Sequence, residues 1–356
     1  MTWHFVRVMA ACAAGLLVSV RAQAWDYEGH RVVNQLALAS LPEEFPGFVR
    51  QPVNAERIAF LAGEPDRWRN SPDLLPLKHA NGMDHYLDYE QLERAGLDVA
   101  TLSPLRYQFA AQFAAGRAAH ADRFAPIDPA KNADHSREWP GFAPWTITEY
   151  YGKLRSAFSY LKAFEEAGTP EEVANAQANI VYLMGVSGHY VGDVAQPLHT
   201  TDHHNGWVGE NPAGYTTWSG IHAWIDGGFI SKAGLDLGAL AKRVHPAATI
   251  SVTPRPDGRD PMFAAVMSYF LAQHAQVVPL YELDKAGKFK VEGTTAAPEG
   301  RAFIEQQLLA GGEMLGAIWV TAWENAIPDT YLRAQLWKRQ AAQAATAPAA
   351  TSSPEP

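Results

Sequence analysis

Two histidine–aspartate pairs, each four residues apart, constrain the fold of this chain more than any other feature. His189 and Asp193 form the first pair, and His222 and Asp226 form the second. Residues four apart share one face of an α-helix, so each pair can direct two ligand atoms at one ion. A lone pair of this kind is typical of a helix-surface hydrogen bond. Two pairs, with His199 between them, instead predict metal sites, because imidazole nitrogens and carboxylate oxygens are zinc-type ligands.

Helical periodicity dominates the chain around these pairs. Apolar residues recur at helical spacing over 32–41, 148–166, 171–190 and 301–337, the last in one or two helices broken near Pro328. The segment 249–252 fits a short strand or a loop, and the sequence holds no series of alternating strands. The composition, 47% hydrophobic and 19% charged, is ordinary for a soluble globular protein. We therefore expect an all-α fold with a single multi-helix domain over residues 25–340.

The two ends of the chain are expected to lie outside this domain. Arg7, a mostly apolar run over 8–20 and the small-x-small sequence Ala22-Gln23-Ala24 are typical of an export signal cleaved after Ala24. The run is shorter than the roughly 20 residues of a membrane span, so we expect no stable span. An uncleaved N-terminal anchor is the alternative. Export predicts a periplasmic or secreted protein, and the Ala/Thr/Ser/Pro-rich segment 341–356 predicts a disordered tail.

Cleavage after Ala24 would change the chemistry of the chain. The single cysteine, Cys12, would leave with the signal, so metal ions become one option for stabilising the fold. Trp25 would gain a free amino group with a pKa of about 8, which makes it a plausible metal ligand. The net charge of -9 does not indicate nucleic-acid binding, but bound metal ions can reverse the field locally.

The sequence from Gly188 to His199, Gly-His-Tyr-Val-Gly-Asp-Val-Ala-Gln-Pro-Leu-His, is specific enough to compare with a known family. It resembles the superfamily that joins the bacterial three-zinc phospholipases C with the fungal and plant single-strand-specific nucleases. Members of that family mature to an N-terminal Trp, as expected here for Trp25, and fold as an all-α bundle. The resemblance covers about residues 25–226 through motifs, and the C-terminal helices more loosely.

The resemblance implies three zinc ions and nine ligand residues. The amine and carbonyl of Trp25 would hold the first ion together with His30. Asp66, His85 and His189 would hold the second ion, and Asp193 would bridge the two. His199, His222 and Asp226 would hold the third ion. Such a centre would attract a phosphate despite the acidic chain, since three divalent ions outweigh three carboxylates.

The resemblance also implies a zinc-dependent phosphodiesterase, in which metal-activated water cleaves a phosphoester bond. Asp66 would orient that water or accept its proton, as is proposed for the family. Arg69, three residues on, is a candidate for binding the phosphate, with a surface salt bridge as the alternative. The sequence contains no His-Glu-x-x-His protease motif, no nucleophile elbow and no P-loop.

Ligand spacing favours the nuclease branch of that superfamily. His30 lies 5 residues after Trp25, His222 lies 23 after His199, and the last ligand is Asp226 rather than Glu. The loop between His199 and His222 lacks the Gly-Gly-Asn run that is common in the nucleases. We expect single-stranded DNA or RNA and 3'-nucleotide phosphate as substrates. A phospholipase C acting on phosphatidylcholine-like lipids and a non-catalytic zinc-binding protein are the alternatives, and no protein partner is implied.

The same loop holds the candidate substrate contacts. His203 and His204 either reach the substrate or are solvated. Trp207 and Tyr215 could stack on a nucleobase, contact lipid or pack within the protein.

Overall fold

Helices make up nearly all of the regular structure, which confirms the expected all-α class. The computed structural model describes residues 25–71, 73–292 and 295–346. In that part of the chain the strands are β1 (Val291–Glu292) and β2 (Thr295–Ala296), which pair antiparallel. The predicted export signal, residues 1–24, lies outside the described residues.

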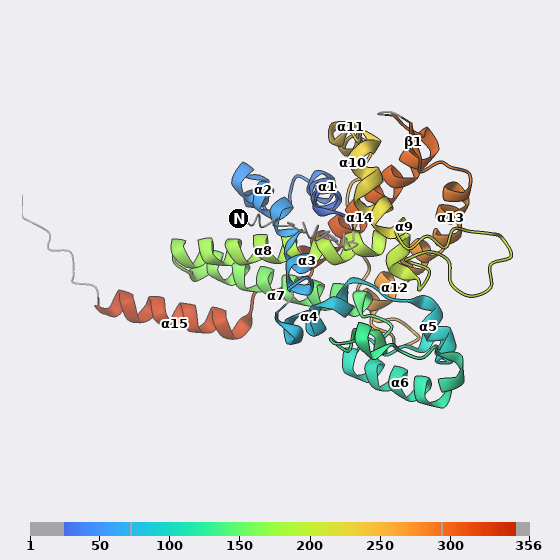
Figure 1. Cartoon of the computed structure of the whole chain (residues 1–356). Coiled ribbons are helices and arrows are strands. Elements are labelled where there is room, and N and C mark those ends of the chain that lie inside the picture. Colours follow the sequence, from blue (N-terminus) through green and yellow to red (C-terminus); the bar gives the residue numbers. More distant parts are fainter. Residues whose placement is uncertain (1–24, 72, 293–294, 347–356) are drawn as a thin grey trace, which may run out of the picture.

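Helix α8 (Pro170–Ala195) lies at the centre of the molecule (Figure 1). It begins with a capping box, in which the Thr169 hydroxyl accepts from the Glu172 N–H and the Glu172 carboxylate accepts from the Thr169 N–H. It ends before Pro197, because the residue preceding a proline disfavours helical geometry. Every residue from Gly185 to Ala195 is buried, so this half of α8 forms the interior of the protein.

Four long helices surround α8. They are α1 (Tyr27–Ser40), α2 (Pro52–Leu61), α7 (Ala143–Ala167) and α14 (Pro298–Glu324). One hydrophobic core joins them and includes the fully buried Trp25, Trp145 and Trp319. This continuous core makes the described chain a single domain.

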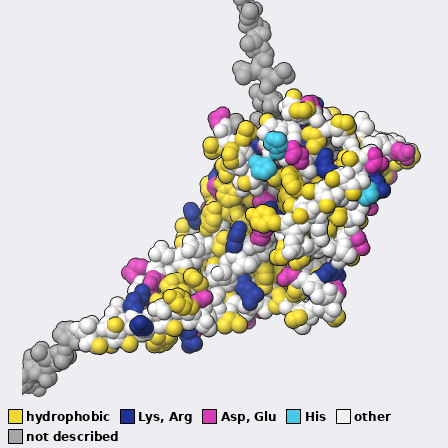
Figure 2. Space-filling view, turned by 90° about the horizontal axis from the view of Figure 1, so that it is seen from below, with side chains coloured by type: hydrophobic (Ala, Val, Ile, Leu, Met, Phe, Trp, Pro, Cys, Tyr) yellow, Lys and Arg dark blue, Asp and Glu magenta, His cyan; other side chains and the backbone are white. Residues whose placement is uncertain are grey.

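Further helices cover the rest of the molecule. They are α3 (Glu64–Arg69), α4 (Leu75–Gly82), α5 (Tyr89–Arg94), α6 (Arg106–Ala119), α9 (Ile221–Ala223), α10 (Ile230–Ala233), α11 (Leu237–Ala241), α12 (Pro261–His274), α13 (Val277–Lys285) and α15 (Thr330–Thr346). Short 3-10 helices lie at Gly47–Arg50, Met83–His85, Val99–Thr101, Ala121–Arg123, Pro129–Lys131, Ser136–Glu138 and Pro197–Thr200, and Trp224–Phe229 is π-helical. On the face shown in Figure 2, Lys and Arg side chains are interspersed with acidic and apolar ones.

Two glycines on α8 allow α1 to approach it closely. A Cβ on Gly188 would lie 1.6 Å from Asn34 Oδ1, and one on Gly192 would lie 2.9 Å from His30 Nδ1. Asn34 has no freedom to move aside, because its amide donates to the carbonyls of Ile58 (2.8 Å) and Gly185 (3.0 Å). Only glycine therefore fits at these positions without displacing α1.

The C-terminal part of the chain confirms one expectation and corrects another. The segment predicted as one or two helices divides into α14 and α15, with the break around Pro328. Residues 341–346, predicted as part of a disordered tail, belong to α15, and residues 347–356 lie outside the described part. Leu336 packs on α7, Gln340 Nε2 donates to the Ala167 carbonyl, and the Ala-rich sequence favours a helix.

Two further expectations concern a short segment and the membrane. Residues 249–252 form a loop rather than a strand. Among the described residues, no helix combines the length and apolar character that crossing a bilayer requires.

Candidate metal centre

Eight predicted ligand side chains meet at the buried C-terminal end of α8. Their ligand atoms fall into three groups, within each of which all atoms lie within 4.8 Å of one another. The groups are His30, Asp66 and His189; His85, His189 and Asp193; and His199, His222 and Asp226. All eight residues are buried, although they come from segments up to 196 positions apart in the numbering, from 30 to 226.

Different elements carry these ligands to one place. Helices α1 and α3 supply His30 and Asp66, and α8 supplies His189 and Asp193. Three-residue and four-residue 3-10 helices carry His85 and His199, while α9 and the π-helical segment carry His222 and Asp226. A π-helical turn is uncommon and is often found at functional sites.

Asp193 lies between the first two groups. Its Oδ2 is 3.0 Å from His85 Nδ1 and 3.3 Å from His189 Nε2. Its Oδ1 faces the other way and lies 3.5 Å from His30 Nε2. The two oxygens of this carboxylate therefore face different imidazoles, as those of a bridging ligand would.

The third group is compact. His222 Nε2 lies 2.9 Å from His199 Nε2 and 2.9 Å from Asp226 Oδ2. The side chain of Gln196 donates to Asp226 Oδ1, which holds the carboxylate so that Oδ2 faces the two imidazoles. This hydrogen bond was not expected from the sequence, because the residue type of Gln196 does not distinguish it from its neighbours.

Backbone carbonyls fix the orientation of two imidazoles. His189 Nδ1 is 2.6 Å from the Ala62 carbonyl oxygen, and His199 Nδ1 is 2.8 Å from the His85 carbonyl oxygen. A carbonyl only accepts, so both Nδ1 atoms carry the proton and donate. Each Nε2 then presents a lone pair to the site, which is the form that a metal ion binds.

The buried polar atoms fit a set of cations. Neither carboxylate oxygen of Asp193 makes a hydrogen bond within the described part of the chain, and the same holds for His85 Nε2. Buried polar atoms without partners are rare because they are costly. The 2.9–3.5 Å separations around Asp193 and His222 include the roughly 3.3–3.5 Å between two ligands of one tetrahedral zinc ion.

Burial sets the charge state of the site in the absence of metal. It lowers the pKa of His189 to about 3, and lowers those of His85 and His199 well below the ordinary value. These imidazoles are therefore neutral at neutral pH and able to bind a cation. Burial also raises the pKa of Asp193 well above its ordinary value, and the positive charge of Arg69 offsets only part of that rise. A divalent cation would supply further positive charge.

Trp25 lies beside this centre. Its side chain is fully buried, and the N–H of the next residue, Asp26, donates to the Asp226 carbonyl at 3.0 Å. The start of the described chain is thus tied to the third group. The structure groups His30 with Asp66 and His189, whereas the resemblance assigns it to Trp25. Ligation by the Trp25 backbone remains a prediction.

A cleft of about 860 Å³ opens onto the metal centre. His199, His222 and Arg69 line it on the side of the ligands. Arg69 Nε lies 2.8 Å from Asp66 Oδ1, so the salt bridge considered from the sequence exists. The Arg69 side chain nevertheless faces the cleft.

The four predicted substrate contacts divide into two pairs. His203 and His204 line the cleft, and the His204 ring lies 5.9 Å from that of His222. Trp207 and Tyr215 instead pack against Tyr281. The Tyr215 hydroxyl donates to Glu282 Oε1 at 2.5 Å, and Trp207 stacks on His203 with ring centroids 3.9 Å apart.

A fourth acidic group, not expected from the sequence, faces the same cleft. Glu90, Asp202 and His203 bring ligand-type atoms together and are half-buried. Glu90 accepts from the Asp202 N–H and the Thr201 hydroxyl, and Asp202 pairs with Arg94. These contacts already satisfy much of the hydrogen-bonding capacity of the two carboxylates.

Comparisons with protein-family models, with curated proteins and with solved structures find no match to this chain. The geometry of the described residues and the motif from Gly188 to His199 are therefore the observations that bear on function.

Proposed function

We propose that this protein is a zinc-dependent hydrolase that cleaves phosphodiester bonds, with single-stranded nucleic acid as its substrate. One observation carries the proposal: eight buried His and Asp side chains form three groups, of which the first two share His189 and the third lines a cleft through His199 and His222. Nitrogen and oxygen ligands at these separations suit zinc, and the neutral imidazoles favour its binding.

The residues of the chain have distinct parts in this proposal. The eight buried side chains, with the Trp25 backbone, would hold the ions. When bound, zinc supplies Lewis-acid activation of water and stabilises the charge that develops on a phosphoryl group. Asp66, 6% exposed, would accept the proton of the attacking water. Arg69 would orient the phosphate from the wall of the cleft, because a guanidinium matches phosphate geometry.

A phospholipid is the second candidate substrate. Apolar and aromatic side chains, among them Phe124, Ile127 and Trp139, line the cleft further from the ligands. They could contact an acyl chain as well as a nucleobase. Hydrolysis of a single-stranded oligonucleotide and of phosphatidylcholine vesicles, measured side by side, separates the two candidates.

The proposal is tested by metal content together with hydrolysis of bis-p-nitrophenyl phosphate, a generic phosphodiester. We expect about three zinc ions per chain, as three ligand groups imply, with hydrolysis lost on chelation and restored by zinc. His222→Ala should lose zinc and activity together. His245→Ala is the matched control, because His245 is exposed and bonds Glu313 away from the centre.

Two results would contradict the proposal. One is less than one zinc ion per chain in protein purified without chelator. The other is hydrolysis that survives both chelation and His222→Ala.

A further inference from the structure

We propose that the cleft continues beyond the metal centre into a cationic wall that binds neighbouring phosphates of a single-stranded nucleic acid. The wall consists of Arg117, Arg123, Lys131 and Arg137, which lie between the end of α6 and the start of α7. This inference rests on the proposed function and adds to it a second site, away from the metal centre, for further phosphates of the same substrate.

The charge of the cleft departs from that of the chain. Six Lys and Arg side chains and four Asp and Glu side chains line it, although the whole chain has a net charge of -9. Two of the arginines, Arg69 and Arg94, are ion-paired. For Arg117, Arg123 and Arg137, no carboxylate lies within ion-pair distance among the residues that the structure describes. These three positive charges are available to a ligand.

The backbone that carries the wall is fixed by hydrogen bonds. Arg137 Nε donates to the Lys131 carbonyl at 2.8 Å, and the Arg137 N–H donates to Asn132 Oδ1 at 3.0 Å. Asn132 in turn donates to Glu138, and Lys78 of α4 lies 2.8 Å from Asp134. These bonds hold the backbone of residues 131–138, which carries Arg137, so this part of the wall is ordered before a ligand binds.

The cleft itself connects the wall to the metal centre. Arg137 lines the same cleft as Arg69 and the proposed ligand His222. One elongated ligand could contact both.

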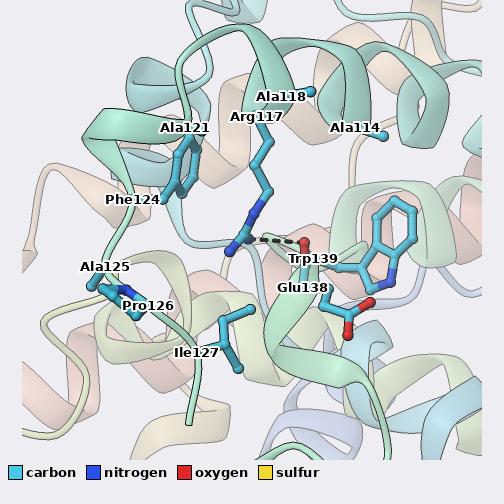
Figure 3. Close-up of a pocket in the computed structure, with 10 residues that line it drawn as sticks. All are labelled: Ala114, Arg117, Ala118, Ala121, Phe124, Ala125, Pro126, Ile127, Glu138 and Trp139. Atoms are coloured by element: carbon cyan, nitrogen blue, oxygen red, sulfur yellow. Dashed lines mark hydrogen bonds between the residues drawn. The ribbon is translucent and has the colours of Figure 1, made fainter. Parts of the chain in front are cut away.

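Aromatic rings lie beside the cations. Figure 3 shows Arg117 extending between Phe124 and Trp139, with its guanidinium donating to the Glu138 carbonyl at 3.0 Å. The guanidinium carbon lies 4.7 Å from the Phe124 ring centre. This pocket of about 630 Å³ shares Arg117, Phe124 and Trp139 with the cleft. Cations next to aromatic faces are the usual means of binding single strands, whose bases stack while the phosphates pair.

The same features disfavour a zwitterionic lipid. Phosphatidylcholine carries one phosphate, which would occupy the metal centre, and a cationic choline. Unpaired arginines would repel that choline at short range. A single strand instead presents a phosphate at every nucleotide and matches a second cationic site.

The inference is tested by binding of fluorescein-labelled oligothymidylate of about 12 nucleotides to chelator-treated protein, so that cleavage does not occur. Arg137→Gln and the double variant Arg123→Gln/Lys131→Gln remove charge from exposed side chains. Each should weaken binding about tenfold. Each lost phosphate contact should reduce the slope of log K against log salt by about 0.7. Arg57→Gln, which removes an exposed arginine on α2, should bind as wild type does.

A second measurement uses the zinc-loaded protein. The wall variants should lose more kcat/KM on oligothymidylate than on a dinucleotide, which has a single phosphodiester. Wild-type binding by both wall variants, or the same loss in Arg57→Gln, would overturn the inference. The inference would also be overturned if the wall variants lost activity on phosphatidylcholine vesicles alone and kept it on oligothymidylate. Binding that behaves as expected without any phosphodiester hydrolysis would support the wall and reject the proposed function, so the two failures are distinguishable.

Discussion

Asp193→Asn should raise the stability of the metal-free protein at neutral pH and lower the stability of the zinc-bound protein. Asp193 is fully buried, and neither carboxylate oxygen makes a hydrogen bond in the described part of the chain. Burial raises its pKa well above 3.8 in the metal-free protein. The folded state therefore keeps a proton that the unfolded chain releases above about pH 3.8. Stability from this group is present below that pH and is lost as pH rises toward the raised pKa.

The size of the effect follows from linkage. Each pH unit between 3.8 and the raised pKa costs the metal-free protein about 1.4 kcal/mol. Asparagine does not ionise, so the metal-free variant should be more stable at pH 7 and should depend less on pH. With zinc, wild type should become the more stable of the two. Zinc at a hundredfold excess over its Kd adds about 2.7 kcal/mol to the free energy of unfolding of wild type. The variant, whose ligand is neutral, should gain less.

Urea unfolding followed by tryptophan fluorescence measures both quantities, once with chelator and once with zinc. Asp122→Asn is the matched control, since Asp122 is exposed and should give wild-type behaviour in both states. The reasoning is refuted if Asp193→Asn destabilises the metal-free protein and still gains the full stabilisation from zinc.

Four further substitutions test packing, capping and hydrogen bonding in the fold. Gly188→Ala should destabilise the protein by about 2–4 kcal/mol in urea unfolding, because the new methyl group displaces Asn34 and its two hydrogen bonds. Gly152→Ala, on an exposed stretch of α7 with open space around it, should instead stabilise by up to about 1 kcal/mol. Thr169→Ala should cost about 1 kcal/mol by removing the cap of α8, with a lowered melting temperature as the readout. Tyr215→Phe should lower stability by about 1 kcal/mol through the lost bond to Glu282 while leaving KM for oligonucleotides unchanged, and a raised KM would show that Tyr215 contacts substrate.

The sequence could predict what local signals encode. Thr169-Pro170 marks the start of α8 and Pro197 marks its end, since caps and prolines act within a few residues. The spacing of His189 and Asp193 predicted that the two side chains share one helical face, and the structure confirms this. These features needed no knowledge of the rest of the fold.

Other features depend on contacts that the sequence does not display. Nothing near Asp226 indicates a π-helical turn or the hydrogen bond from Gln196. The aromatic character of Trp207 does not reveal that it packs against Tyr281 instead of lining the cleft. The residues of the cationic wall follow no periodic pattern in the sequence. Their segment is linked to α4 by the ion pair between Lys78 and Asp134, which lie more than fifty positions apart in the numbering.

One short stretch of α8 contacts α1 on one face and the candidate metal centre on the other, and this limits how its sequence can diverge. Within Gly188–Asp193, the glycines touch α1 while His189 and Asp193 face the site. Substitution at these four positions would alter either the helix contact or the ligand set. Most other core positions tolerate apolar exchanges of similar volume. Relatives could therefore drift until whole-chain similarity is lost and still share Gly-His-x-x-Gly-Asp, so this short pattern is the feature by which to seek them.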